Sequence, residues 1–149
     1  MIPESTWTDG RYLLEPFYKI YPIGFIRKSN DIAEIEIGAE FTDALLGLDL
    51  FSHIHVLYWF HQNDTPEKRS ILRVHPRKKK QYPLTGVFAT HSPARPNLLA
   101  LSLCRIISIT SNRIRIHEID AHDGSPVIDI KCYIPPDESL KNVHLPDWV

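Results

Sequence analysis

Polar side chains are concentrated in one short loop of the sequence GVFATHSPARPNLLALS, residues 86–102. Its hydrogen-bonding members are His91, Ser92, Arg95 and Asn97. Pro93 and Pro96 stiffen the loop, so these groups are held ready for a carboxylate, a ribose or a purine edge. The same side chains could instead serve the loop itself, with Asn97 capping a turn and Arg95 pairing with a structural acid. Taken alone, the loop leaves both interpretations open.

Carboxylates crowd a second segment, EIDAHDGSPVIDIKCY, residues 118–133. It contains Asp120 and Asp129 on either side of an Asp123-Gly124 pair, which predicts a turn. The acids could hold a cation, accept a proton or anchor ribose hydroxyls. The alternative is an ordinary turn in which an aspartate side chain bonds its own backbone.

Short strands must position these two segments. Residues 33–37 alternate apolar and acidic side chains, the period of a strand with one buried face. Residues 51–61 are aromatic and β-branched throughout, which predicts a strand buried on both sides. Residues 98–110 and 113–120 predict two strands joined by a two-residue hairpin turn, and a further strand is expected over 86–90.

The twelve prolines fall largely between these runs, where a missing amide donor does little harm. Many short strands separated by turn residues predict a mostly β fold, a barrel or a sandwich. One short helix is expected around residues 43–48. At 149 residues the chain fits one domain, with a core over about 18–137 and tails at residues 1–16 and 137–149.

Composition excludes several classes of protein. Hydrophobic residues make up 43% and charged residues 23%, and no apolar run is long enough to cross a bilayer. The N-terminus does not read as a signal peptide, so a cytoplasmic location is expected. Cys104 and Cys132 have no short metal-ligand spacing, and a disulfide between them is not favoured in a reducing compartment.

In this order and spacing, the two polar segments resemble the TsaA-like family of tRNA adenosine methyltransferases. The family signatures resemble GVFATRSPxRPNPIGLS and LDGTPVLDIKPY, and both occur here in recognisable form. Further similarity lies in Pro22-Ile23-Gly24 and in GLDLFSHIHVLYWFH, residues 47–61. The similarity extends over roughly residues 18–137.

The resemblance implies a small antiparallel β-barrel that uses S-adenosylmethionine to methylate a modified adenosine beside the tRNA anticodon. It also implies a homodimer with the cofactor near the dimer interface. An exocyclic amine acceptor needs a base, for which the expected candidates are Asp120 and Asp123. Carried over by position, the expected cofactor contacts are His61, Gln62, His91, Ser92, Arg95, Asn97, Leu101, Ala121, His122, Asp123, Gly124 and Ser125.

The chain departs from the family pattern at three places. His91 replaces an arginine, so a permanent forked cation gives way to a side chain that is mostly neutral at pH 7. Residues 98–100, Leu-Leu-Ala, replace Pro-Ile-Gly, and the loop after Gly24 is shorter than in relatives. The alternative function is therefore a non-catalytic or repurposed barrel that binds a nucleotide-like ligand and RNA.

Two other clusters contain side chains that could bind a metal or RNA. His53 and His55 share one face of a predicted strand with Trp59, but the glutamate of a cupin-type metal motif is absent, and no metal site is predicted. Basic side chains recur over residues 68–80 and could neutralise RNA phosphates, or could be a solvated loop. The residues expected to contact tRNA are Arg73, Arg77, Lys78, Lys79 and Lys80.

Overall fold

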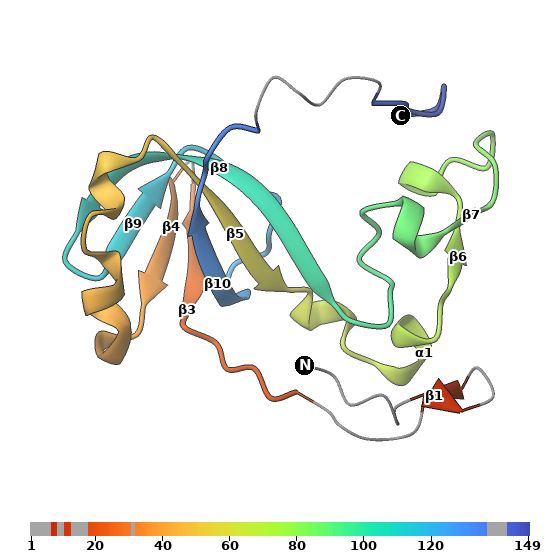
Figure 1. The fold of residues 1–149 in the computed structure, drawn as a ribbon, viewed down its shortest axis with the longest axis horizontal. Coiled ribbons are helices and arrows are strands. Elements are labelled where there is room, and N and C mark those ends of the chain that lie inside the picture. Colours follow the sequence, from red (N-terminus) through yellow and green to blue (C-terminus); the bar gives the residue numbers. More distant parts are fainter. Residues whose placement is uncertain (1–6, 9–10, 13–17, 31, 137–142) are drawn as a thin grey trace.

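A closed barrel of antiparallel strands forms the body of the molecule (Figure 1). The computed structural model describes residues 7–8, 11–12, 18–30, 32–136 and 143–149. Around the barrel the order is β10-β3-β4-β9-β8-β5, and β10 pairs again with β5. The strands are β3 (Gly24–Ser29), β4 (Ile32–Ile37), β5 (His53–Trp59), β8 (Leu99–Thr110), β9 (Arg113–Ile116) and β10 (Pro126–Cys132). The predicted mostly β, antiparallel barrel is confirmed.

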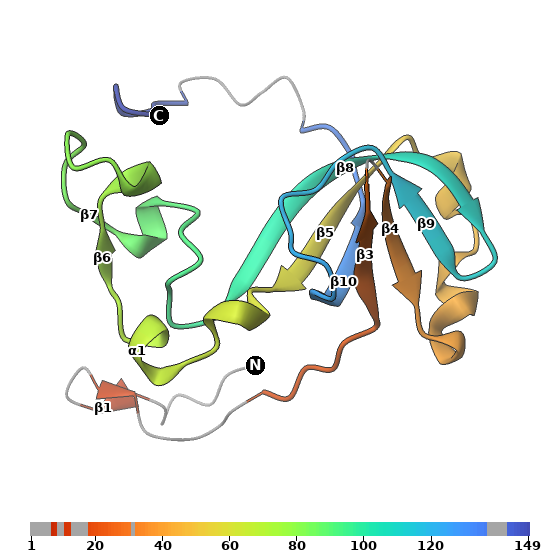
Figure 2. The same ribbon diagram turned by 180° about the vertical axis from the view of Figure 1, so that it is seen from behind.

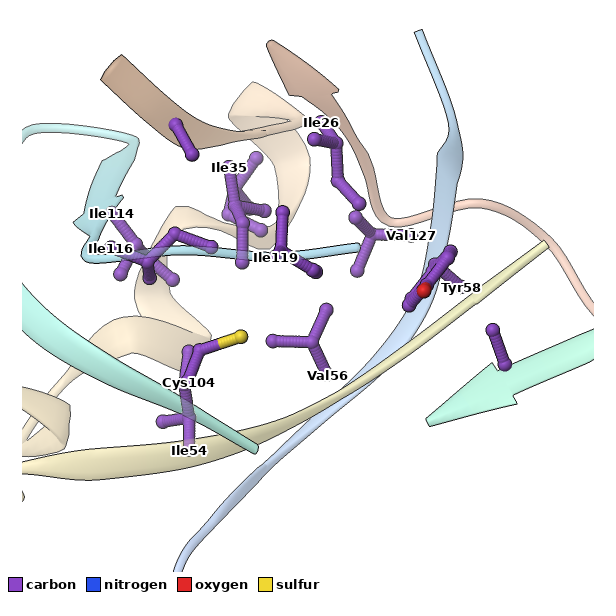
Figure 3. Close-up of a cluster of buried hydrophobic side chains, with 13 residues drawn as sticks. Ile26, Ile35, Ile54, Val56, Tyr58, Cys104, Ile114, Ile116, Ile119 and Val127 are labelled. Carbon is purple, nitrogen blue, oxygen red and sulfur yellow. The ribbon is translucent and has the colours of Figure 1, made fainter. Parts of the chain in front are cut away.

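The barrel interior is filled by aliphatic side chains, as the alternating pattern predicts. On β4, Ile35 and Ile37 are 0% and 2% exposed, while Glu34 and Glu36, which alternate with them, lie on the outer face. Figure 3 shows the labelled side chains pointing toward one another inside the barrel. The core comprises Ile26, Ala33, Ile35, Ile37, Ile54, Val56, Tyr58, Ala100, Cys104, Ile114, Ile116, Ile119 and Val127.

The strand predicted over 51–61 is shorter than expected and alternates in burial. Ile54, Val56 and Tyr58 point into the core, whereas His53 and His55 on the opposite face are only half-buried. The prediction that both faces are buried is therefore wrong. Aromatic and β-branched residues give a strand, but they do not reveal whether a second layer covers its outer side.

Two close contacts join β4 to its neighbours in the barrel. Gly24 lies so near β4 that an added Cβ would sit 2.2 Å from the carbonyl oxygen of Glu36. The β8–β9 hairpin turns at Ser111 and Asn112 as predicted, and the Asn112 side-chain amide donates to the Ile37 carbonyl at 2.7 Å. The strand after this turn ends at Ile116 rather than at residue 120. Register shifts on β10 and β8 add the local twist that a small barrel needs.

The helix expected over 43–48 is displaced. The chain forms two 3-10 turns, η2 (Ala39–Leu45) and η3 (Leu48–Leu50), separated by Gly47 at φ 80°. A left-handed residue ends one turn and starts the next, so no continuous helix crosses it.

A small lobe stands apart from the barrel, and both views show it at the end where β5 finishes and β8 begins (Figures 1 and 2). It holds η4 (His61–Asn63), α1 (Pro66–Arg69), η5 (Pro76–Lys78), η6 (Val87–Ala89) and the pair β6 (Arg73–Val74) and β7 (Thr85–Gly86). The strand predicted over 86–90 is wrong beyond Gly86. Buried Val87 starts η6, and both the amide and the hydroxyl of Thr90 donate to its carbonyl.

Residues 1–6, 9–10, 13–16 and 137–142 of the expected tails lie outside the described residues. Within the N-terminal segment β1 (Trp7–Thr8) pairs with β2 (Arg11–Tyr12). Cys104 and Cys132 are free thiols. Among the described helices, none has the length and hydropathy needed to cross a bilayer.

Candidate functional site

The principal cavity of the described structure lies where the barrel meets the lobe, and its volume is about 1000 Å³. Most of the residues predicted from the sequence line it, although they come from three separate segments. These are His61, Gln62, His91, Arg95, Asn97, Leu101, Asp120, Ala121, His122 and Ser125. Three predicted residues, Ser92, Asp123 and Gly124, are not part of the lining.

The end of β5 brings the first segment to the cavity. The Phe60 amide donates to the Leu98 carbonyl at 2.8 Å, so the chain after β5 continues beside the start of β8. His61 Nδ1 then lies 3.3 Å from the hydroxyl oxygen of Ser125, which is 2% exposed. This contact joins His61 to the Asp-Gly turn. His61 therefore belongs to the cavity and not to the His53–His55 face.

The proline-rich loop is held largely by its own hydrogen bonds. The Ser92 amide donates to the Thr90 hydroxyl, and the Ser92 hydroxyl accepts from the Ala94 amide at 3.2 Å. Arg95 Nη1 donates to the Thr90 carbonyl at 3.3 Å. Ser92 thus shapes the loop rather than lining the cavity, while half-buried Arg95 does both.

Strand β3 and Tyr58 fix the third segment. The Tyr58 hydroxyl donates to the Asp120 carbonyl, and Lys28 Nζ donates to the carbonyls of Ile119 and Ala121 at 3.0 and 3.1 Å. Burial raises the pKa of the Tyr58 phenol, the largest effect on that group, so it stays protonated and able to donate. The carbonyls of residues 119, 120 and 121 are therefore held by side chains of the barrel strands β3 and β5.

The Asp123 carboxylate has a structural partner. Its Oδ1 accepts from the Lys28 amide at 2.8 Å, while Gly124, at φ 76°, donates its amide to the Ile26 carbonyl at 2.8 Å. The Asp-Gly turn is therefore as predicted, but its carboxylate caps β3 rather than its own backbone. Of the two predicted acids, Asp120 alone lines the cavity.

Sequence reasoning missed several lining residues. Lys28, Tyr58 and Phe88 all border the cavity, and Phe88 is 81% exposed. Lys28 follows Gly24 in the segment that is shorter than in relatives, and this segment forms β3, from which Lys28 supplies a cation to the cavity. The inward alternation along β5 could have found Tyr58, since a phenol buried at a strand end needs a polar partner.

The two other clusters lie elsewhere. His53 and His55 make edge-to-face contacts with the Tyr133 ring on the outside of the barrel. Within the described part of the chain, no three His, Cys, Asp or Glu side chains come together as a metal site would require. The basic residues named for tRNA contact are all exposed on the lobe, and Arg77 and Lys78 have positive φ values.

The chemistry of the cavity is that of a pocket for a charged, ring-bearing ligand. Cationic or hydrogen-bonding groups come from Lys28, Arg95 and the three histidines, and apolar surface comes from Phe60, Phe88 and Leu101. A carboxylate fits the first set, and a planar ring fits the second. Asp120 adds one acid that can attract a positive centre or accept a proton.

Comparison with known proteins identifies the family. The tRNA-methyltransferase O N-terminal domain matches residues 21–138. The chain belongs to this family. It is 48% identical over 116 residues to a probable S-adenosyl-L-methionine-binding protein of Pyrococcus horikoshii, covering 78% of this chain and 82% of that one. A protein of the same description from Methanocaldococcus jannaschii is 45% identical, with 78% and 92% of the two chains covered.

More distant members of the family include named enzymes. The human tRNA (adenine(37)-N6)-methyltransferase is 38% identical over 103 residues, which are 69% of this chain and 23% of that protein. The crystal structure of TrmO from Pseudomonas aeruginosa superposes with a TM-score of 0.65 at 27% identity, covering 87% of this chain and 62% of that one. The chain thus spans less than two thirds of the crystallised family member.

Proposed function

We propose that this protein binds S-adenosylmethionine in the cavity between barrel and lobe and transfers its methyl group to a modified adenosine near the tRNA anticodon, or to a related acceptor. The observation that carries the proposal is the convergence of His61, Arg95 and Asp120, from three segments, on one cavity. Relatives that match most of the chain are described as binding this cofactor. The expected cytoplasmic location is part of the proposal.

The cavity residues fit the cofactor by charge and shape. Arg95 and His91 offer donors to the carboxylate, and Phe60 and Leu101 offer apolar surface to the adenine. Bound S-adenosylmethionine would supply a methyl group on a positively charged sulfur. Because such a transfer depends on alignment more than on a covalent intermediate, the rigid loop and the fixed 119–121 segment contribute chiefly by positioning.

Asp120 is the favoured base. As the acceptor nitrogen forms its bond to the methyl carbon, the carbon–sulfur bond breaks and its electron pair stays on sulfur, which leaves a neutral thioether. The nitrogen must then lose a proton, which the Asp120 carboxylate can take. Asp123 is less suited, since its Oδ1 already accepts from the Lys28 amide.

RNA contact is proposed for the lobe. Arg73, Arg77 and Lys78 to Lys80 are exposed there, and a cluster of cations can neutralise phosphates beside a target base. Replacing Arg77 and Lys79 by glutamine should weaken tRNA binding and reduce its salt dependence, as filter binding at several salt concentrations would show. Equal binding and an unchanged salt slope would argue against this surface.

A homodimer is proposed through the outer face of β8. Leu99, Leu101 and Leu103 project there and are 38%, 58% and 50% exposed. Leu99 and Leu101 also line the cavity, so a second copy seated on this face would adjoin the cofactor. Light scattering should give twice the chain mass for the native protein and one chain mass for Leu103→Glu. A native monomer would contradict the dimer.

Titration calorimetry with S-adenosylmethionine tests the first step. Binding at micromolar to low millimolar concentration is expected, and no heat at millimolar cofactor would overturn the assignment. Mass analysis of nucleosides from a deletion strain tests the acceptor, because loss of the methylated adenosine is expected there. Unchanged methylation in that strain would remove the tRNA assignment.

A second candidate function is a barrel that binds the cofactor or a nucleotide-like ligand without transferring the methyl group. The replacements at His91 and at Leu98 to Ala100 favour it, because His91, Leu99 and Ala100 line the cavity. Purified protein that binds S-adenosylmethionine but releases no S-adenosylhomocysteine with tRNA would support this alternative.

A further inference from the structure

Three side chains interlock at the junction of barrel and lobe. Both oxygens of the Asp64 carboxylate are used: Oδ1 accepts from Arg69 Nε at 2.8 Å, and Oδ2 accepts from Trp59 Nε1 at 3.0 Å. The Arg69 guanidinium carbon also lies 5.3 Å from the Trp59 ring centre. Trp59 ends β5 and Arg69 ends α1, so the cluster joins the barrel to the lobe.

The same arginine reaches the cavity loop. Arg69 Nη1 donates to the carbonyl oxygen of Pro96 at 3.0 Å, across 27 positions of the chain. Pro96 stands between Arg95 and Asn97, the two polar loop residues that line the cavity beside it. One guanidinium therefore connects the Asp64 carboxylate, the Trp59 ring and the backbone between two candidate ligand contacts.

The loop's own side-chain hydrogen bonds lie within residues 90–95, whereas Pro96 is held from outside by Arg69. Prolines at 93 and 96 have no amide hydrogen, which reduces the number of backbone bonds the loop can make. The loop's other described anchors are the Ser92–Thr90, Ala94–Ser92 and Arg95–Thr90 bonds inside it and the Phe60–Leu98 bond at its end. Arg69 holds the stretch between them, where the direction of the Arg95 side chain is set.

Stability alone does not account for the cluster. The Arg69 and Asp64 side chains are 36% and 43% exposed, and ion pairs with this much solvent contact add little to folding. A guanidinium that bonds a carboxylate and a carbonyl in two directions is instead well suited to fixing geometry.

We propose that Arg69 is a positioning residue, which holds the Arg95–Asn97 stretch in its ligand-binding conformation through Pro96. The proposal rests on the proposed cofactor site. Asp64 orients the Arg69 side chain, and the Trp59 ring lies beside its guanidinium group. Arg69 in turn restricts the conformation of the loop through its bond to Pro96. Support of this kind around a binding site commonly changes affinity by tenfold or more when it is removed.

The test compares Arg69→Met with Arg113→Met in the full chain. Arg113 is a matched control, because it contacts Glu34 and Glu36 on the β4–β9 surface of the barrel and does not line the cavity. Three quantities are measured: the S-adenosylmethionine dissociation constant, amide hydrogen exchange over residues 90–98, and the unfolding midpoint.

For Arg69→Met we expect about tenfold weaker cofactor binding, faster exchange over 90–98 and a midpoint close to that of Arg113→Met. Arg69→Lys keeps the charge but not the fork, so it should restore only part of the affinity. Slow exchange over 90–98 in Arg69→Met would overturn the proposal. So would native affinity in that variant, or an equal loss of affinity in Arg113→Met.

The proposed function fails by a different result. If the native protein binds no S-adenosylmethionine, the cofactor assignment falls, yet the exchange measurement still decides whether Arg69 orders the loop. Native binding together with unchanged affinity in Arg69→Met leaves the function standing and removes the positioning role.

Discussion

The Tyr58 hydroxyl and the Asp120 carbonyl oxygen lie 2.5 Å apart, a direct tie between the inner wall of the barrel and the segment that carries the candidate base. Tyr58 is 3% exposed, so its hydroxyl depends on protein partners. Tyr58→Phe removes the donor and should lower the free energy of unfolding by about 1 kcal/mol, measured with urea. Turnover should fall further than cofactor affinity, since the Asp120 segment loosens.

Tyr133→Phe is the control for that experiment, because Tyr133 lies on the outer face near His55. Equal effects of the two changes on turnover would show that the Tyr58 hydroxyl does not position Asp120.

Substitution of Asp120 should affect methyl transfer, whereas substitution of Asp123 should affect stability. Asp120→Asn should reduce methyl transfer by about 10²-fold or more without changing stability, because a base is lost from an exposed position. Asp123→Ala should cost about 1 to 2 kcal/mol of stability, since the Lys28 amide loses its acceptor. Asp123→Asn keeps an acceptor oxygen, so its stability and its rate of methyl transfer should both stay close to those of the native protein. Loss of transfer in Asp123→Asn with native stability would reverse the assignment of the base.

His91→Arg restores the side chain that the family pattern favours at a cavity-lining position. A permanent cation with a forked donor set should tighten S-adenosylmethionine binding by about 1 kcal/mol, several-fold in the dissociation constant measured by calorimetry. His117→Arg, on an exposed residue that does not line the cavity, controls for added charge. No difference between the two variants would show that residue 91 does not contact the cofactor carboxylate.

Gly24→Ala should be among the most damaging single changes in the barrel. The new methyl group would lie 2.2 Å from the Glu36 carbonyl oxygen, and only movement of the β3–β4 backbone could relieve it. We expect a loss of about 3 kcal/mol or more, or failure to fold. Gly86→Ala is the control, because its added methyl would lie 4.0 Å from the Leu72 carbonyl oxygen, an ordinary contact. Similar unfolding midpoints for the two would contradict the close approach.

Cys104 makes stability depend on alkaline pH. Burial raises the pKa of its thiol to about 11, whereas an unfolded cysteine ionises near 9. The neutral thiol's contribution is therefore fully present below pH 9 and is lost as pH rises through 11. Unfolding midpoints between pH 8 and 11 should fall in the native protein and fall less in Cys104→Ala. At pH 8, iodoacetamide should modify Cys132 and spare Cys104; modification of Cys104 first would contradict its burial.

The fold could be predicted in outline because period-two alternation appears wherever a strand has one face in the core, as it does around Ile35. The prediction of individual elements failed where tertiary contacts decide the local structure. Val87 continues an apolar run, yet its burial in the lobe turns the chain into η6. The outer side of β5 was predicted to be buried because its residues are aromatic and β-branched, but the structure leaves His53 and His55 half-buried there, in contact with the Tyr133 ring.

The sequence indicated which segments of the chain line the cavity, but it did not indicate what each side chain in those segments bonds to. Resemblance placed His61, Arg95 and Asp120 in one cavity, and the structure brings them together. It could not show that Asp123 caps Lys28 or that Arg69 reaches Pro96, because both bonds join residues distant in sequence. Lys28 escaped notice for the same reason.

The segment between β6 and β7 lies at the end of the lobe opposite α1, away from the connection to the barrel, in both views (Figures 1 and 2). Its length can therefore change without altering any barrel strand or its register. Under the proposed function, insertions and deletions there would offer natural selection, or a protein engineer, a way to alter which acceptor is admitted while the cofactor site stays the same. Acceptor choice and methyl donation would then evolve as separable traits on one scaffold.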